Sequence, residues 1–303
     1  MKVRSILFVL ALALFVTPAF AQKGFKKIIV DQDWMQKHID DENVVILHVG
    51  DTTKYAEGHI KNSRYINAPH FTRVVGDLYW ELPEAEVLNK NLRDRGVDKK
   101  SKIVLVHGGN GHAATFRLYF TLDYFGLSKN VVILDGGLKG WKANNLAVTT
   151  EVPEVKAKAE NQLIFRSNTS IKVDKDYVNA NSLKDEINVI DARRAAYYEG
   201  NGGSHDSYTR SGHIPGAENI CWLDIVDENL FMKDFDTLKA YYEEAGAEKK
   251  EEVVAYCHVG LRASVIYTVA KGLGYKVRLY DGSYNEWDTL SEEYPTKKGK
   301  ESK

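Results

Sequence analysis

An internal repeat constrains this chain more than any other feature of its sequence. Three short landmarks occur once in each half, in the same order and at nearly constant spacing. Residues 57–60 match 211–214, with Gly-His-Ile in both, at an offset of 154 residues. The apolar run 103–107 matches 253–256 at an offset of 149. Residues 134–137 match 280–283, with Asp-Gly and a small residue in both, at an offset of 146. This spacing predicts two homologous domains of roughly 130 residues each and not a short-period solenoid.

Both halves alternate short apolar runs with amphipathic segments. The expected strands are 44–49, 103–107 and 131–135 in the first half and 187–191, 253–256 and 277–280 in the second. The expected helices are 83–96, 112–125, 234–245 and 261–273. Continuously apolar strands are buried on both faces, so the pattern predicts an α/β fold in which each domain has a central, mostly parallel sheet flanked by helices.

The first residues have the pattern of an export signal. Lys2 and Arg4 precede an apolar run over 6–16, and Ala19 and Ala21 form a small-residue cleavage site. The run is shorter than the ~20 residues that a membrane span needs. We therefore expect a signal peptide over 1–21 and a periplasmic or secreted mature protein without a membrane segment.

The remainder divides into three segments. A stretch rich in Lys, Glu, Thr and Pro with little periodicity separates the two halves. The expected boundaries are a first domain over 22–148, a linker over 149–170 and a second domain over 171–303.

Charge and cysteine content exclude several function classes. The 41 Lys and Arg residues balance 42 Asp and Glu residues, without the basic excess of a non-specific nucleic-acid binder. Two cysteines cannot form a disulfide framework or a zinc cluster, and the nine histidines show no His-Glu-x-x-His spacing. We expect no bound nucleic acid, metal or cofactor.

Cys257 stands where a parallel sheet usually carries chemistry. It follows the apolar run 253–256 directly and precedes a predicted helix, and ligands of such sheets bind beyond the carboxyl ends of the strands. The loop that it opens consists of Cys257, His258, Val259, Gly260, Leu261 and Arg262. Loop N–H groups and the helix N-terminus favour an anion, so we expect a lowered thiol pKa and a nucleophilic thiolate. The alternative is a small buried cysteine that ends a core strand.

The two halves differ at this position. Gly108 takes the place of Cys257 in the first half, while Gly111 matches Gly260. Thiol chemistry is therefore possible only in the second half.

These motifs resemble the rhodanese family. A strand followed by Cys-x-x-Gly-x-x and a helix lies between Gly-His-Ile-Pro-Gly-Ala upstream and Asp-Gly-Ser-x-x-x-Trp downstream. The two-domain form, with its cysteine in the second half, is similar to thiosulfate and 3-mercaptopyruvate sulfurtransferases across nearly all of residues 30–292. The resemblance implies an inactive first domain, a persulfide on Cys257, and an Arg193 that reaches the loop to hold an anionic substrate.

The chemistry expected from the residues agrees with that resemblance. The Cys257 thiolate would take sulfane sulfur from a small anionic donor and pass it to a thiol or to cyanide. Arg193 and Arg262 would hold anionic groups, and Arg193 could alternatively form a surface or interdomain salt bridge. The loop differs from the Cys-Gly-x-Gly-Val-Thr pattern of mercaptopyruvate-type enzymes and from the Arg-then-Lys pattern of vertebrate thiosulfate enzymes. Its cation Arg262, with a second charge from His258 when protonated, favours thiosulfate as donor.

Two other functions fit parts of the pattern. A cysteine phosphatase uses Cys-x5-Arg, whereas Cys257 and Arg262 form Cys-x4-Arg, a shorter loop that suits a single sulfur atom better than a phosphoryl group. A non-catalytic module that binds sulfur or relays it to a partner protein would need the same thiol.

Several further residues have expected structural roles. His59 and His213 occur in both halves, which favours turn capping by side-chain hydrogen bonds. Cys221 is expected to be a buried thiol in a strand, outside the chemistry. Tyr197, Tyr198 and Tyr208 lie around a glycine-rich insertion and either border the substrate entrance or have packing or surface roles.

Overall fold

The structure is a computed structural model, and it describes residues 24–109, 111–159, 163–202, 209–247 and 252–300. The expected signal peptide over 1–21 lies outside the described residues. Within these ranges, no helix combines the length and the apolar character needed to cross a membrane.

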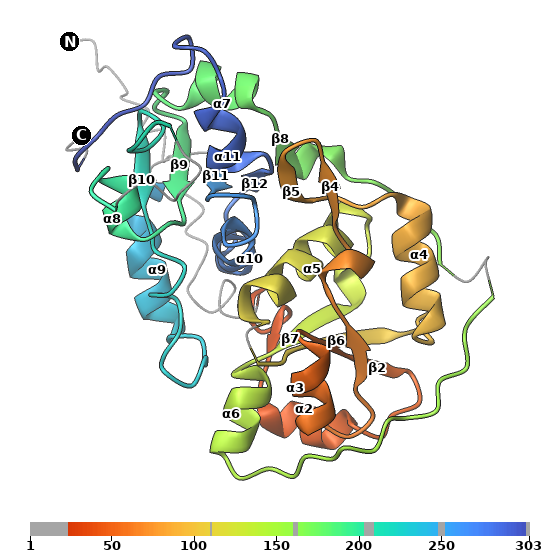
Figure 1. Cartoon of the computed structure of the whole chain (residues 1–303). Helices are drawn as coiled ribbons and strands as arrows, with labels where there is room; N and C mark the ends of the chain where they lie inside the picture. Colours follow the sequence, from red (N-terminus) through yellow and green to blue (C-terminus); the bar gives the residue numbers. More distant parts are fainter. Residues whose placement is uncertain (1–23, 110, 160–162, 203–208, 248–251, 301–303) are drawn as a thin grey trace, which may run out of the picture.

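Two five-stranded sheets form the centres of two lobes (Figure 1). The first sheet contains β1 (Ile29–Val30), β2 (Val44–Val49), β3 (Arg64–Ile66), β6 (Lys102–His107) and β7 (Val131–Leu134). The second contains β8 (Lys172–Val173), β9 (Ile187–Asp191), β10 (Ala217–Asn219), β11 (Glu252–Tyr256) and β12 (Val277–Tyr280). All pairings within them are parallel, which confirms the predicted α/β fold with two parallel sheets.

The strand orders show that the repeat extends to the topology. The first sheet has the order β1-β7-β6-β2-β3, and the second, read from its other edge, has the order β8-β12-β11-β9-β10. Each strand of one sheet therefore has a counterpart at the same place in the other. In particular, β6 and β11 are equivalent central strands.

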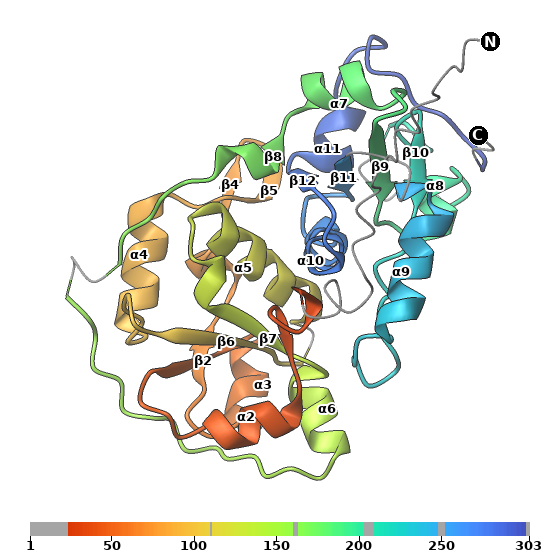
Figure 2. The ribbon, with the colours of Figure 1, turned by 180° about the vertical axis from the view of Figure 1, so that it is seen from behind.

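Helices cover both faces of each sheet (Figures 1 and 2). Those of the first lobe are α2 (Gln32–His38), α3 (Thr52–Glu57), α4 (Ala85–Asp94), α5 (His112–Tyr124) and α6 (Gly137–Ala143). Those of the second are α7 (Lys175–Asn181), α8 (Ala195–Tyr198), α9 (Phe235–Glu244), α10 (Ala263–Leu273) and α11 (Ser283–Asp288). Short 3-10 turns occur at Ala68–His70, Ser128–Asn130 and Thr169–Ile171.

The helices α5 and α10 pack against each other and join the lobes (Figure 2). Both are buried on nearly all sides, as expected of helices that lie between two sheets. Across this contact, the ring of Phe120 meets the ring of Tyr267 edge to face, with centroids 5.0 Å apart. One hydrophobic core therefore continues from the first lobe into the second.

Each lobe also sends a segment toward the other. The antiparallel hairpin β4 (Arg73–Val75) and β5 (Leu78–Glu81) reaches the second lobe, where Asn285 donates a hydrogen bond to the carbonyl of Asp77 at 2.9 Å. In return, the N–H of Met232 donates to the carboxylate of Asp135 at 2.8 Å. These reciprocal contacts join each lobe to a segment of the other.

The two Gly-His-Ile landmarks have the same structure, which confirms the expected role of their histidines. Nδ1 of His59 lies 2.9 Å from the carbonyl of Tyr55, and the two rings stack at 3.8 Å. Nδ1 of His213 lies 2.7 Å from the carbonyl of Tyr198, and these rings stack at 3.9 Å. Both histidines are buried and bind backbone, as structural turn histidines do.

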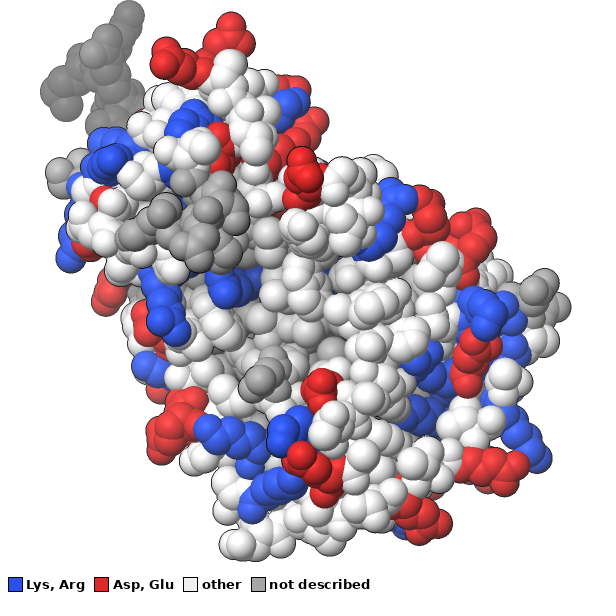
Figure 3. Space-filling view, viewed as in Figure 1, with Lys and Arg blue, Asp and Glu red and all other residues white. Residues whose placement is uncertain are grey.

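The surface carries no field of a single sign on the face seen in Figure 3. Basic and acidic side chains are interspersed there, and a largely uncharged band crosses the face between the lobes. The distribution agrees with the balanced composition.

Candidate active site

Cys257 lies at the carboxyl end of the central strand β11, where the sequence places it. Its side chain is fully buried, and its carbonyl accepts a hydrogen bond from the N–H of Tyr284 at 3.0 Å. The segment 257–262, called the Cys257 loop below, then leads into α10. The turn is made by Gly260, which has a φ of +73°. Any side chain there would be strained by that backbone conformation and would also meet Asp281 at 2.8 Å.

Ser283 holds the Cys257 loop from the side of β12. Its Oγ accepts hydrogen bonds from the N–H groups of Cys257 at 3.2 Å and of Gly260 at 3.0 Å, and it donates to the carbonyl of Tyr280 at 2.8 Å. We expected the loop N–H groups to face a ligand, but two of them bind this hydroxyl. Sequence reasoning missed Ser283 as a site residue, although its replacement by Gly137 in the first half was a usable signal.

Three other N–H groups of the Cys257 loop are available to an anion. Those of Val259, Leu261 and Arg262 have no hydrogen-bond acceptor among the residues that the structure describes. All three residues are half-buried, at the N-terminus of α10. Unpaired N–H groups at a helix N-terminus are the usual partners of a bound anion.

Arg262 and His258 form a pair at the end of the Cys257 loop. Nη1 of Arg262 donates to Nδ1 of His258 at 2.8 Å. This bond uses the lone pair of the imidazole, so in this arrangement His258 does not supply the second positive charge that we expected. The ring of Tyr197 contacts His258 edge to face at 4.9 Å, which places Tyr197 beside the loop. Tyr198 instead packs inside the domain.

Trp222 connects this pair to the first domain. The guanidinium of Arg262 lies 5.9 Å from the indole centroid. The same indole stacks on His112 of α5 at 5.7 Å. The cationic end of the Cys257 loop thus lies at the domain boundary.

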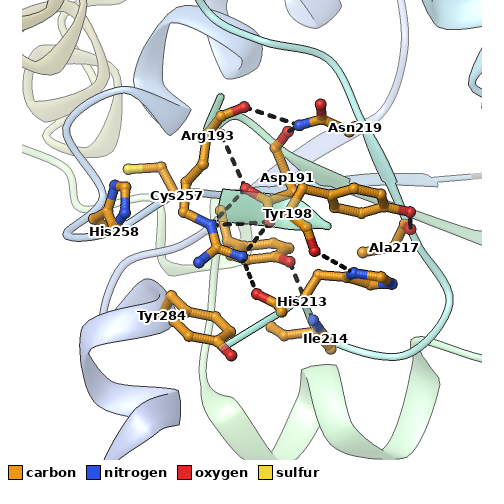
Figure 4. Close-up of polar contacts among 12 residues, drawn as sticks. Asp191, Arg193, Tyr198, His213, Ile214, Ala217, Asn219, Cys257, His258 and Tyr284 are labelled. Carbon is orange, nitrogen blue, oxygen red and sulfur yellow. Dashed lines mark hydrogen bonds and ion pairs between the residues drawn. The ribbon is translucent and has the colours of Figure 1, made fainter. Parts of the chain in front are cut away.

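Arg193 is held beside the Cys257 loop by its own strand end (Figure 4). Its Nη2 donates to the carboxylate of Asp191 at 2.6 Å and to the carbonyl of Gly212 at 2.7 Å, and its guanidinium lies 3.9 Å from the ring centroid of Tyr284. The alternative of a surface or interdomain salt bridge is therefore wrong, because the ion pair of Arg193 with Asp191 is buried inside the second domain. Nη1 makes no hydrogen bond within the described ranges.

The charge on Arg193 is stabilised in place. Burial opposes it, but the carboxylate of Asp191 outweighs burial and holds the pKa of Arg193 above its ordinary value. The amide of Asn219 donates to the carbonyls of Asp191 at 2.7 Å and of Arg193 at 2.9 Å, which fixes the backbone of this turn (Figure 4). The result is a rigid guanidinium with one free terminus.

The equivalent site of the first domain is filled. A Cβ atom at Gly108 would lie 1.8 Å from Nε2 of His48, so the imidazole occupies the space of a cysteine side chain. His48 has no exposed surface, and burial lowers its pKa to about 4. The strand registers also place Asp51 where the second domain has Arg193. The first domain lacks the nucleophile, the space for it and the cation.

Cys221 is not the buried strand residue that we expected. It follows β10 in a turn and is half-buried, because its strand ends at Asn219. Both cysteines are free thiols. Burial raises the pKa of the Cys221 thiol, which disfavours its reactive thiolate form.

No group of three or more His, Cys, Asp and Glu side chains within the described ranges could hold a metal ion.

Comparisons of the sequence with known proteins show similarity over both domains. The family model of the rhodanese-like domain matches residues 31–144 and 174–290. The chain is 31% identical to "Sulfur carrier protein TtuD" of Thermus thermophilus over 277 residues, which cover 87% of this chain and 94% of that protein. It is 29% identical to 3-mercaptopyruvate sulfurtransferase of Escherichia coli over 272 residues, or 85% of this chain and 94% of that protein.

Solved structures share the fold. The Tum1 protein of Saccharomyces cerevisiae superposes with a TM-score of 0.77 at 20% identity, over 90% of this chain and 99% of its own. The wild-type structure of EanB superposes with a TM-score of 0.78 at 20% identity, over 90% of this chain and 69% of its own.

Proposed function

The chain belongs to the rhodanese-like domain family, and on that premise we propose that it is a sulfurtransferase in which Cys257 carries sulfane sulfur as a persulfide. The observation that carries the proposal is the position of Cys257. Its thiol ends the central strand of the second sheet, at the N-terminus of α10 and beside the anchored guanidinium of Arg193.

The proposed reaction has two steps. The Cys257 thiolate attacks the outer sulfur of thiosulfate, a new S–S bond forms, and the S–S bond of the donor breaks with its electron pair leaving on sulfite. A thiolate or cyanide then attacks the terminal sulfur of the persulfide, and the electron pair returns to Cys257. Splitting one transfer into two covalent steps is nucleophilic catalysis of the ping-pong type.

Charge favours thiosulfate as the donor. The free Nη1 of Arg193 and the half-buried Arg262 can both bind the sulfonate oxygens of a dianion, and so can the unpaired N–H groups of Val259 and Leu261. These groups would also stabilise the departing sulfite. The alternative donor is 3-mercaptopyruvate, from which cleavage of the C–S bond releases the enolate of pyruvate.

A sulfur-relay function is the second candidate. The relative from Thermus thermophilus is named a sulfur carrier protein. In that case Cys257 would receive the same sulfur atom but pass it to a partner protein and not to a small acceptor.

Mass spectrometry and steady-state kinetics test the proposal together. Intact mass after incubation with thiosulfate should show one added sulfur in the wild type and in Cys221→Ser, and none in Cys257→Ser. Thiocyanate formation from thiosulfate and cyanide, compared with turnover of 3-mercaptopyruvate, identifies the donor. An adduct without turnover supports the relay, whereas no adduct with either donor contradicts the proposal.

We also propose that the chain is exported and cleaved after Ala21. The basic residues, apolar run and small residues of segment 1–21 support this. Sequencing the N-terminus of the protein isolated from its native cell should yield Gln22 first. A protein that retains segment 1–21 would contradict the proposal.

A further inference from the structure

An ion pair joins the two domains directly beneath the Cys257 loop. Arg117 lies on α5 of the first domain and Asp281 follows β12 of the second, and neither side chain has exposed surface. Nη1 of the guanidinium pairs with Oδ1 of the carboxylate, and Nη2 lies 3.2 Å from Oδ2. A two-point contact of this kind fixes the orientation of both groups.

Gly260 packs onto this ion pair. A Cβ atom at Gly260 would lie 2.8 Å from Oδ1 of Asp281 and 3.0 Å from Nη1 of Arg117. The backbone of the Cys257 loop therefore rests on both partners at once. Asp281 is also two residues before Ser283, whose hydroxyl binds the N–H of Cys257. The ion pair is thus linked to the loop by direct contact and through the short segment 281–283.

Lys172 and Glu81 lie next to this ion pair and add one basic and one acidic side chain to it. Nζ of Lys172 lies 3.3 Å from Asp281 and 3.4 Å from Glu81. Burial opposes the charge of Asp281, but Arg117 and Lys172 outweigh burial and hold the pKa of that carboxyl below its ordinary value. Asp281 is therefore ionised, and Arg117 is its two-point partner.

We propose that Arg117 is a positioning residue, supplied by the first domain, that holds the Cys257 loop in its reactive conformation through Asp281 and Gly260. The inference rests on the proposed sulfur-carrier role of Cys257. The first domain, which has no nucleophile of its own, would thereby have a role in the reaction. That domain would support the chemistry by fixing the loop from below, since small displacements of a reacting group cost large factors in rate.

A second ion pair between the domains, which joins helices α5 and α10, provides a matched control. Near the opposite end of α10, Asp123 of α5 pairs with Lys271 and accepts a hydrogen bond from the hydroxyl of Tyr267 at 2.7 Å. Lys271 is nine residues after Arg262 and does not belong to the Cys257 loop. Its removal weakens the domain contact without touching the loop.

The test compares three variants of the full chain in a Cys221→Ser background. Arg117→Gln with Asp281→Asn removes both charges, Arg117→Lys keeps the charge without the two-point contact, and Lys271→Gln is the control. For each variant we measure thiosulfate:cyanide turnover and the rate at which iodoacetamide alkylates Cys257. Both rates are measured well below the thermal unfolding midpoint of that variant. We expect kcat and the alkylation rate of the double variant to fall by about tenfold or more, because the loop leaves its reactive conformation. Arg117→Lys should give intermediate rates. Lys271→Gln should lower the thermal unfolding midpoint but leave kcat and the alkylation rate unchanged.

The outcomes separate positioning from simple domain contact. If the double variant keeps kcat and alkylation within about twofold of wild type while its midpoint falls, Arg117 only joins the domains and the inference is wrong. Should the double variant not fold, Arg117→Lys decides by the same two rates. Alkylation does not need sulfur transfer, so a wild type that forms no persulfide overturns the proposed function and leaves this comparison intact.

Discussion

The Oγ atom of Ser283 lies 3.2 Å from the backbone nitrogen of Cys257 and accepts its hydrogen bond. The same hydroxyl accepts the N–H of Gly260 at 3.0 Å, so one side chain spans the Cys257 loop from its first to its fourth residue. This contact gives the serine after Asp-Gly a role in the second domain, whereas in the first domain a Cβ atom at Gly137 would lie 2.4 Å from the ring of His107.

Removing the hydroxyl of Ser283 should slow persulfide formation. In Ser283→Ala, two loop N–H groups lose their acceptor, and we expect a two- to tenfold decrease in rate, about the net value of one neutral hydrogen bond. Single-turnover mass analysis with thiosulfate measures the rate. Ser283→Gly is the matched control for backbone strain, because Ser283 has a φ of +53° that glycine tolerates. A wild-type rate in both variants would show that the hydroxyl does not matter.

A cysteine introduced at Gly108 should not create a second sulfur carrier. The ring of His48 fills the space that its side chain needs, so Gly108→Cys should be destabilised by about 1–3 kcal/mol through overpacking. Intact mass after thiosulfate treatment should still show one added sulfur. His48→Ala with Gly108→Cys opens the space and serves as the comparison. Two added sulfurs on the single variant Gly108→Cys would contradict this view of the first domain.

Arg193 should contribute to donor binding and to stability, in separable ways. Arg193→Gln leaves Asp191 buried without its cation, which typically costs about 3–5 kcal/mol of unfolding free energy. Arg193→Lys keeps a charge but loses the fork geometry, so we expect a raised KM for thiosulfate with a smaller loss of stability. Denaturant unfolding and steady-state kinetics measure the two effects. Arg194→Gln, at the exposed neighbour, should change neither; an unchanged KM in Arg193→Lys would remove Arg193 from the donor site.

Stability should decrease as the pH falls from about 6.5 to about 4. Burial lowers the pKa of His48 and of His112 to about 4, from an ordinary value of 6.5. Between these pH values the two histidines are protonated in the unfolded chain but neutral in the folded chain. Each ring therefore lowers the free energy of unfolding by about 3 kcal/mol across this window. Unfolding in urea at several pH values measures the slope. His112→Phe should flatten it, since the site is already aromatic. Equal slopes in the wild type and in His112→Phe would refute the assignment.

Local pattern was sufficient for the buried strands and the long helices. The predicted strands 44–49 and 187–191 agree with β2 and β9, and the predicted helix 261–273 differs from α10 by two residues at its start. Continuous apolar runs and 3.6-residue periodicity are properties of neighbouring residues, so they can be read directly.

Short and irregular elements were not predictable in this way. The edge strands β1 and β8 have two residues each, too few for any periodicity. The hairpin β4–β5 exposes Val74 and Tyr79 and is stabilised in part by its contact with the other lobe. Its existence depends on packing and not on local pattern.

The sequence by itself determined that the chain holds two copies of one fold, that only the second copy has a cysteine after its central strand, and which chemistry this thiol suits. All of these follow from residue order and spacing. Only the tertiary structure decided that His48 fills the first site, that Arg193 is anchored by Asp191, and that Arg117 lies beneath Gly260. Arg117 and Asp281 are 164 residues apart in the chain. Such contacts arise when two sheets and their helices pack, and no local pattern encodes which side chains then meet.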